Sequence, residues 1–244
     1  RSGLPMIRRI SVGARARQRG LSLVEMMVGI AVGLFVAAGA VVVVTTQLGD
    51  NRRLLLETQV QQDLRATADI ITRELRRAGA DSTPMNQIWA PGIGTTLNTR
   101  TSITHSDEFR QVNFEYLRVT PAGEQPGPWG FQLDVGRGVI RTLLGTGGWQ
   151  DLTDGNAMKV TDFRVRPQAP IVHDIPCQRG CGGNPADTSC WPTLTTRVYD
   201  IEISAHAASD LNVQRSIRSQ VRGRNDVLTK RGGVLLPPNQ MCPA

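Results

Sequence analysis

The sequence lacks the short motifs that mark common enzymes. It has no G-x-S-x-G, no phosphate-binding G-x4-G-K-[ST] and no H-E-x-x-H. Only three histidines occur, and His105 and His206 have no partner side chain at a motif spacing. Gly145 to Gly148 is a glycine-rich turn, too short and isolated for a nucleotide-binding loop. Asp200 and Glu202 alternate as on the solvent face of a strand. We therefore name no catalytic residue and expect neither enzyme activity nor a cofactor.

Acidic residues are absent from the first twenty positions, which hold six arginines. The whole chain has a formal charge of +7, but residues 21–244 contain 22 basic and 21 acidic side chains. The basic character therefore belongs to an N-terminal stretch of the kind that is removed as a leader. Met6 is followed by Ile-Arg-Arg, so we expect translation to start at Met6.

Aromatic residues are scarce, at 5% of the chain. This bears on a group of arginines near the C-terminus, because proteins that bind single-stranded nucleic acid combine basic grooves with aromatic stacking platforms. No such aromatics lie near the group, which we interpret as a solvated strand face, and nucleic acid is not an expected partner. The arginines are Arg215, Arg218, Arg222 and Arg224.

Charge is also absent from a long internal run. Met26 to Gly49 is 24 consecutive residues without a charged side chain. As a helix rising about 1.5 Å per residue, this run extends roughly 36 Å, enough to cross a bilayer core. Val41 to Val44 are β-branched, but a single segment in lipid must satisfy its own backbone hydrogen bonds, and this favours helix. The preceding arginines predict a cytoplasmic N-terminus and an exported remainder.

One carboxylate stands at the start of this apolar segment. An acid within a membrane segment is costly and needs a partner. Cleavage after Gly20 would create one, the free α-amine of Leu21 on a neighbouring subunit, and a charge pair between Glu25 and that amine would fix the axial stagger of the two chains. A plain signal anchor would explain the arginines and the apolar run, but not the position of Glu25.

The string Gly20-Leu21-Ser22-Leu23-Val24-Glu25-Met26-Met27 resembles the leader junction of type IV pilins and type II secretion pseudopilins. The resemblance implies that a membrane peptidase cuts after Gly20, that Leu21 becomes the methylated N-terminus and that Glu25 aids assembly. Phenylalanine is more frequent than leucine at the first mature position of that family, so Leu21 is a departure.

The helix is predicted to continue beyond the membrane. A stripe of apolar residues recurs every three or four positions, and Gly79 can end the helix as a left-handed cap. The segment Asp63 to Gly79, DLRATADIITRELRRAG, is similar to the end of the long helix in PilW-like minor pilins. The stripe consists of Leu56, Val60, Leu64, Ala68, Ile71 and Leu75.

Residues 80–108 have little periodicity and are predicted to form a connecting loop. Alternation then indicates strands, with Gly136 to Gly138 as a turn. A long helix followed by strands predicts an α+β fold, in which an antiparallel sheet packs on the exported half of the helix. The strand candidates are Val112/Phe114/Tyr116, Phe131/Leu133/Val135, Val139/Arg141/Leu143, Met158 to Arg166, Arg197 to Ala207 and Val213 to Gly223.

The four cysteines are even in number and lie on the exported side, where disulfides form. Three pairings are possible, and we favour one bond within the loop 177–190 and one from that loop to Cys242 near the C-terminus. A metal site that also uses His173 is the alternative, but its spacing departs from common zinc patterns. The cysteines are Cys177, Cys181, Cys190 and Cys242.

These expectations define four segments: a leader in 1–20, an apolar membrane and assembly helix in 21–49, an amphipathic half-helix in 50–79 and a periplasmic domain in 80–244. The resemblance implies a minor pilin, anchored in the inner membrane before it enters a pilus. Its partners would be other major and minor pilins, the prepilin peptidase, the inner-membrane assembly platform and the lipid bilayer. A minor pseudopilin of type II secretion and a signal-anchored periplasmic binding domain are the alternatives.

Overall fold

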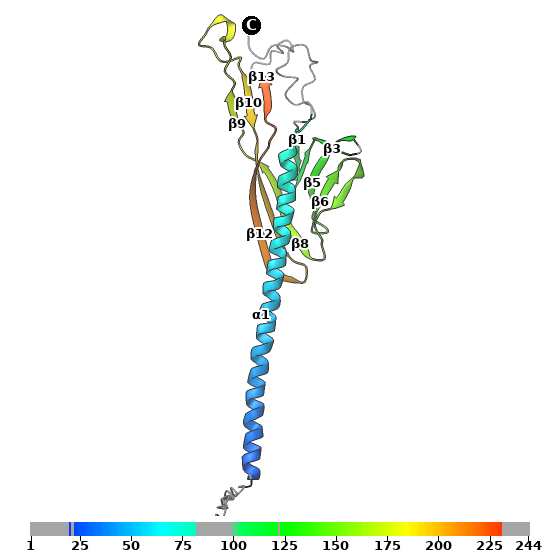
Figure 1. The fold of residues 1–244 in the computed structure, drawn as a ribbon, viewed down its shortest axis with the longest axis vertical. Helices are drawn as coiled ribbons and strands as arrows, with labels where there is room; N and C mark the ends of the chain where they lie inside the picture. The colour runs from blue at the N-terminus through cyan, green and yellow to red at the C-terminus, as the bar shows by residue number, and fades with distance from the viewer. Residues whose placement is uncertain (1–19, 21, 82–99, 101, 122, 231–244) are drawn as a thin grey trace, which may run out of the picture. The chain divides into compact units, whose positions relative to one another are not determined.

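A computed structural model describes residues 20, 22–81, 100, 102–121 and 123–230 of the chain. One long helix is followed by strands that pair in antiparallel fashion, which confirms the predicted α+β class and its pilin-like arrangement (Figure 1). Two compact units divide the chain, one comprising residues 1–51 and the other residues 52–244. The helix α1, Leu23–Arg77, begins in the first unit and ends in the second.

In the first unit α1 is apolar and uncovered. All its described side chains are exposed, and the helix is long and apolar enough to cross a membrane. The β-branched run Val41 to Val44 is helical, as the lipid argument predicts. Thr45 and Thr46 follow this run, and both hydroxyls donate to the carbonyl of Val42, one turn back. The hydroxyl of Thr45 also donates to the carbonyl of Val41. Such bonds satisfy polar side chains without breaking the helix.

In the second unit α1 buries one stripe. The residues predicted to face the sheet are buried from Val60 onward, with at most 2% of each exposed, and Leu56 is partly buried. Gly79 has a φ of +81°, the left-handed conformation expected of a cap. Burying a Leu or Ile side chain contributes roughly 1.5–3 kcal/mol, so this stripe holds the helix in the domain. The buried members are Val60, Leu64, Ala68, Ile71 and Leu75.

A five-stranded antiparallel sheet, in the order β1-β2-β5-β6-β7, carries the aromatic half of the core. Phe114 and Phe131 are buried, with ring centroids 6.0 Å apart. The hairpin β3 (Leu117–Thr120) and β4 (Gly123–Pro126) follows β2. The five strands are β1 (Ile103–Ser106), β2 (Gln111–Phe114), β5 (Trp129–Asp134), β6 (Val139–Leu144) and β7 (Trp149–Asp151).

A three-stranded sheet, in the order β12-β11-β8, carries the rest of the core, which is mostly aliphatic but includes Phe163. Its strands are β8 (Met158–Pro167), β11 (Val198–Ala207) and β12 (Asp210–Arg222). Every second residue of β11 is buried, and Ile203 lies in register with Phe163 of β8 and Ile217 of β12. Strict alternation of this kind places one face of the strand on the core and the other towards solvent.

A further three-stranded sheet, in the order β13-β10-β9, extends the previous one. Strand β8 leads into β9, β10 into β11 and β12 into β13, so both sheets keep the same strand order (Figure 1). We call β9, β10 and β13 with their connecting loops the arm. The arm strands are β9 (Ile171–Asp174), β10 (Pro192–Thr196) and β13 (Val227–Lys230).

Several local predictions were wrong. Strand β1 lies inside the segment predicted as a loop, residues 80–108, because Ile103 pairs with Phe114 across a hairpin. Strand β5 ends at Asp134, so Val135 is 65% exposed in the turn that follows instead of extending the alternation. The strand predicted to begin at Val139 is present as β6, but its buried residues are the consecutive pair Val139 and Ile140 instead of every second residue.

Candidate functional site

The N-terminal junction lies just outside the helix. Gly20 is exposed, and no heavy atom lies within 4 Å of the position that a Cβ would occupy. The first helical hydrogen bond runs from the amide of Met26 to the carbonyl of Ser22, 3.1 Å apart, and α1 begins at Leu23. Leu21 lies outside the described residues. The peptide bond after Gly20 therefore precedes the helical ladder.

Glu25 stands in the first turn of α1. Its side chain is exposed, and it is the only charged side chain between Ser22 and Gly49. No ion pair to it exists among the described residues of the chain. A carboxylate is stabilised at a helix N-terminus by the helix dipole, worth about 0.3–1 kcal/mol. That stabilisation is smaller than the cost of burying a charge in lipid, so within a membrane the helix dipole alone would not compensate Glu25.

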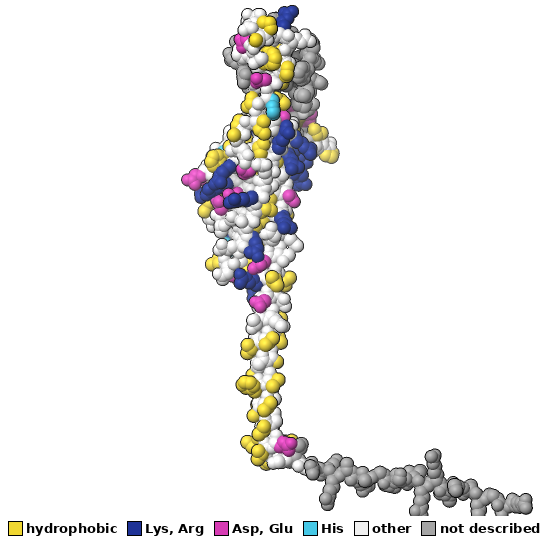
Figure 2. All heavy atoms as spheres, turned by 90° about the vertical axis from the view of Figure 1, so that its left-hand side faces the viewer, with side chains coloured by type: hydrophobic (Ala, Val, Ile, Leu, Met, Phe, Trp, Pro, Cys, Tyr) yellow, Lys and Arg dark blue, Asp and Glu magenta, His cyan; other side chains and the backbone are white. Residues whose placement is uncertain are grey.

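The surface of the first half of α1 is predominantly apolar. Figure 2 shows hydrophobic side chains along the full length of the first half of α1. Large residues are exposed on every side of it, for example Phe35 at 82% and Leu34 at 67%. An exposed apolar surface this extensive marks contact with a membrane or with other proteins. The chain is therefore membrane-anchored through its N-terminal helix.

The C-terminal arginines do not form one cationic patch. Arg215 projects from the inner face of β12 and pairs with Glu57 of α1, whereas Arg218 pairs with Glu202 on the outer face, 2.8 Å apart. Arg222 contacts Asp226 at 3.3 Å. The fourth, Arg224, lies beyond the end of β12 and donates its main-chain amide to the carbonyl of Arg76. Three of the four cations are thus neutralised by acids of the same unit.

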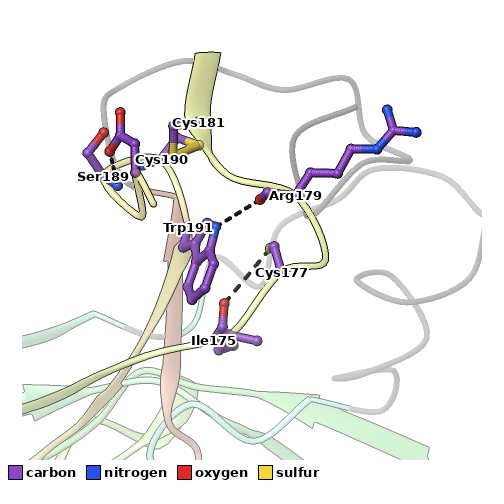
Figure 3. Close-up of a disulfide and its surroundings, with 8 residues drawn as sticks. Ile175, Cys177, Arg179, Cys181, Ser189, Cys190 and Trp191 are labelled. Atoms are coloured by element: carbon purple, nitrogen blue, oxygen red, sulfur yellow. Dashed lines mark hydrogen bonds between the residues drawn. A yellow bond between two sulfur atoms is a disulfide. The ribbon is translucent and has the colours of Figure 1, made fainter. Parts of the chain in front are cut away.

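A disulfide closes the loop at the end of the arm. Cys181 and Cys190 are bonded, with their Cα atoms 5.6 Å apart (Figure 3). The indole of Trp191 donates to the carbonyl of Arg179 across this loop. Cys177, with its sulfur 3.8 Å from the carbonyl of Ile175, is not a free thiol. The expected bond to Cys242 lies outside the described residues.

The alternative metal site finds no support in the described part of the chain. His173 is exposed on β9, and no three His, Cys, Asp or Glu side chains within the described ranges are placed to hold a metal ion. The buried sulfur of Cys181 accepts the main-chain amide of Cys190, 2.8 Å away, in addition to its disulfide bond. The loop 177–190 is thus organised by covalent and main-chain bonds.

Sequence reasoning missed a polar cluster at the end of α1. Glu74 accepts the hydroxyl of Tyr116 and contacts the guanidinium groups of Arg118 at 3.4 Å and Arg77 at 3.2 Å. Burial, and then the neighbouring carboxylate, raise the pKa of Tyr116. Arg118 also lies over the ring of Trp129, 4.3 Å from its centroid. No sequence pattern pairs Tyr116 with Glu74, because they are 42 residues apart. The one available signal was that Tyr116 extends the alternation of Val112 and Phe114.

A second missed feature satisfies the carbonyls at the end of α1. The side-chain amide of Asn225 donates to the carbonyls of Arg77 and Ala78, at 3.3 and 3.0 Å. The amide of Arg224 donates to the carbonyl of Arg76 at 3.1 Å. The last carbonyls of a helix have no partner within it, and here the linker between β12 and β13 supplies their donors. We call this the helix-end clamp.

Comparisons with known proteins give two matches. A family model described as prepilin peptidase-dependent protein B covers residues 53–223, more than half of the chain. A model of the prokaryotic N-terminal methylation motif covers residues 15–41, which include Gly20, Leu21 and Glu25. No curated protein and no solved structure gives a significant match. The two models together span both the junction and the strands that pack on α1.

Proposed function

Because the chain belongs to the family of prepilin peptidase-dependent protein B, a group of pilin-like structural proteins, we propose that it is a minor type IV pilin without catalytic activity. It would be incorporated into pili or prime their assembly. The observation that carries this proposal is the position of Glu25: it is the only charge in the apolar part of α1 after Ser22, and it stands four residues after the first residue of the proposed mature chain.

The proposed maturation step is cleavage between Gly20 and Leu21, followed by methylation of Leu21. The exposure of Gly20 and the start of α1 at Leu23 support it, because a peptidase can reach an extended peptide without unwinding a helix. Cleavage removes the six arginines and creates an α-amine. We propose that this amine, on a neighbouring subunit, pairs with Glu25 and offsets the cost of burying the carboxylate.

The proposed location is the inner membrane, with a single crossing and residues 52–244 in the periplasm, before assembly. The arginines ahead of α1 support this orientation. The disulfide Cys181–Cys190 supports an oxidising compartment for the arm. The proposed partners are other major and minor pilins, the prepilin peptidase and the assembly platform in the inner membrane.

A PilW-like assignment is supported by the end of α1. The segment Asp63 to Gly79 contains the last turns of α1, which ends at Arg77; its stripe residues Leu64, Ala68, Ile71 and Leu75 are buried, and its arginines are exposed or paired with acids. A minor pseudopilin of type II secretion shares the N-terminal features. The discriminating experiment is a deletion scored for piliation and for protein secretion in parallel. Loss of pili with normal secretion supports the pilin; the reverse overturns it in favour of the pseudopilin.

The maturation step has its own test. We expect Gly20→Val to block processing, because a β-branched side chain at the scissile position obstructs a peptidase that accepts glycine. Mass spectrometry of the mature chain should give an N-terminus at methylated Leu21 for wild type and an intact leader for the variant. Ser22→Ala, two residues away, is the matched control and should be processed. A wild-type chain that keeps its leader in cells with an active prepilin peptidase would refute the proposal and favour a permanent signal anchor.

A further inference from the structure

An apolar cavity of about 180 Å³ lies between the second half of α1 and the strands β5 and β6. Glu74 and Arg118 form a charged edge to it, and the remaining lining is apolar or weakly polar. An apolar cavity of about 150 Å³ can bind a benzene-sized group, so this one has room for one aliphatic or aromatic side chain. Its apolar lining includes Ile70, Phe114, Phe131, Leu143, Leu144 and Leu152.

The same helix presents a side chain that suits this cavity. Leu54 and Leu55 are 60% and 72% exposed, although the apolar stripe that follows them is buried. Arg52 lies three positions before Leu55 and therefore on the same side of the helix. Arg52 is exposed, and no ion-pair partner for it exists among the described residues. One side of α1 thus combines an uncovered leucine with an unpaired cation.

An acid without an ion-pair partner among the described residues stands next in sequence to the cavity lining. Asp69 precedes Ile70 on α1, is exposed and has no ion-pair partner within the described ranges. Glu74, which lines the cavity, is by contrast already held by Arg118 and Arg77. A segment that brings an apolar side chain together with a cation would therefore match both the cavity and the free carboxylate next to it.

We propose that Leu55 of one copy of this chain enters the cavity of a second copy, where Arg52 meets Asp69. This inference rests on the proposed function, since it names a contact between pilin subunits. Two parallel helices offset by 15 to 17 residues bring Leu55 to Ile70 and Arg52 to Asp69. At about 1.5 Å per residue the offset is roughly 23–26 Å along the helix.

The two surfaces differ, so the contact is heterologous. When Leu55 of one copy fills the cavity of a second copy, the cavity of the first copy stays open. Leu55 of the second copy also stays free to enter a third copy. Contacts of this kind form rings or open helical filaments, whereas a contact between identical patches closes a dimer. The proposed contact is thus of the type that a filament requires.

Engineered cysteines test the contact in the full-length chain in its native membrane and pili. One tagged copy carries Leu55→Cys and a differently tagged copy carries Thr142→Cys, on the cavity wall. No described cysteine is a free thiol, so the added residues are the reactive ones. We expect an oxidative cross-link between the two tags when both copies are present and none when either is alone. Leu211→Cys, 65% exposed at the start of β12, replaces Leu55→Cys as a matched control and should not cross-link.

Three results would overturn the inference. The first is the absence of a cross-link between processed, incorporated chains, and the second is a cross-linked product whose mass identifies another pilin. The third is a dimer of the Leu55→Cys copy alone, which would indicate a contact between identical patches. The N-terminal mass and the incorporation into pili are measured on the same samples. An unprocessed chain refutes the proposed function itself, and the inference with it, whereas a processed and incorporated chain without the cross-link refutes only the inference.

Charge-reversal variants test the proposed ion pair between Arg52 and Asp69. We expect Arg52→Glu or Asp69→Arg alone to lower the cross-link yield about two- to fivefold, in line with an exposed ion pair. The two together should restore it. Arg65→Glu, an exposed arginine of α1 without an ion-pair partner among the described residues, is the control and should have no effect. Failure of the double variant to recover, with both singles impaired, would exclude the proposed pairing.

Discussion

At the scale of single residues, Glu25 is the position where the chain departs most from ordinary membrane helices. It begins an apolar helix that otherwise carries no charge up to Asp50. A signal anchor has no use for a carboxylate at this depth, whereas under the proposed function a subunit that exchanges lipid for neighbouring helices would gain a cation there. The acid is therefore expected to matter after cleavage and not before it.

We expect Glu25→Ala to be processed as wild type but incorporated into pili at a strongly reduced level. The scissile bond precedes the helix, so cleavage does not need the carboxylate. Assembly would lose the inter-subunit pair. Mass spectrometry of the N-terminus and immunoblots of sheared pili measure the two steps separately. Glu25→Asp, which keeps the charge, should be less impaired, and equal incorporation of Glu25→Ala and wild type would rule out the pair.

Glu74 illustrates a polar residue whose role depends on its surroundings. Its carboxylate is the common acceptor for Tyr116 and Arg118. We expect Glu74→Ala to lower the free energy of unfolding by about 1–3 kcal/mol and Tyr116→Phe to lower it by about 1 kcal/mol. The first variant costs more because the loss of Glu74 leaves two partly buried donors without their acceptor. Urea unfolding of the full chain in detergent measures both. Equal costs would show that the cluster contributes packing alone.

At the scale of elements, the helix-end clamp joins α1 to the root of the arm. Asn225→Ala removes two side-chain donors from the carbonyls of Arg77 and Ala78. We expect a loss of about 1–2 kcal/mol in the free energy of unfolding. Asn212→Ala, at an exposed position near the start of β12 where the side-chain amide donates to Asp210, is the control and should cost less. The clamp would be unimportant to stability if both variants unfolded at the same urea concentration.

How far the sequence predicts these elements depends on their periodicity. The stripe on α1 and the alternation of β8 and β11 follow from apolar spacing, and the structure confirms them. The arm was not predicted, because all four residues of β9 are exposed and no alternation marks it. Likewise the clamp joins Asn225 to a helix end 147 residues earlier, and such a contact exists only once the chain has folded.

At the scale of the whole molecule, acid should weaken the domain through His105. Burial lowers the pKa of His105 from 6.5, and its Nε2 has no hydrogen-bond partner among the described residues. The native state therefore binds fewer protons than the unfolded state between the two pKa values, and stability rises with pH across that window. The stability that neutral His105 contributes is fully present above pH 6.5, and it is lost as the pH falls through the lower pKa of the native state.

Urea unfolding between pH 5 and 7 measures this effect. We expect the free energy of unfolding of the wild-type chain to fall on acidification within that range. His105→Gln should show a smaller dependence, since its side chain does not titrate. His206→Gln is the control, because His206 has its Nδ1 within 2.9 Å of a carbonyl and lies at the far end of β11. Parallel pH profiles for wild type and His105→Gln would assign the acid sensitivity to other groups.

The continuous strand order between the arm and the β12-β11-β8 sheet has a mechanical consequence. A pull on the disulfide-closed loop would run along β9 and β10 into β8 and β11, and their ladders to β13 and β12 would carry it to the third strand. The ladder hydrogen bonds of antiparallel strands lie perpendicular to that direction, so they would be loaded together in shear instead of being opened one after another. Tension applied at the arm would thus reach α1 through the clamp and the buried stripe before any single strand is peeled away.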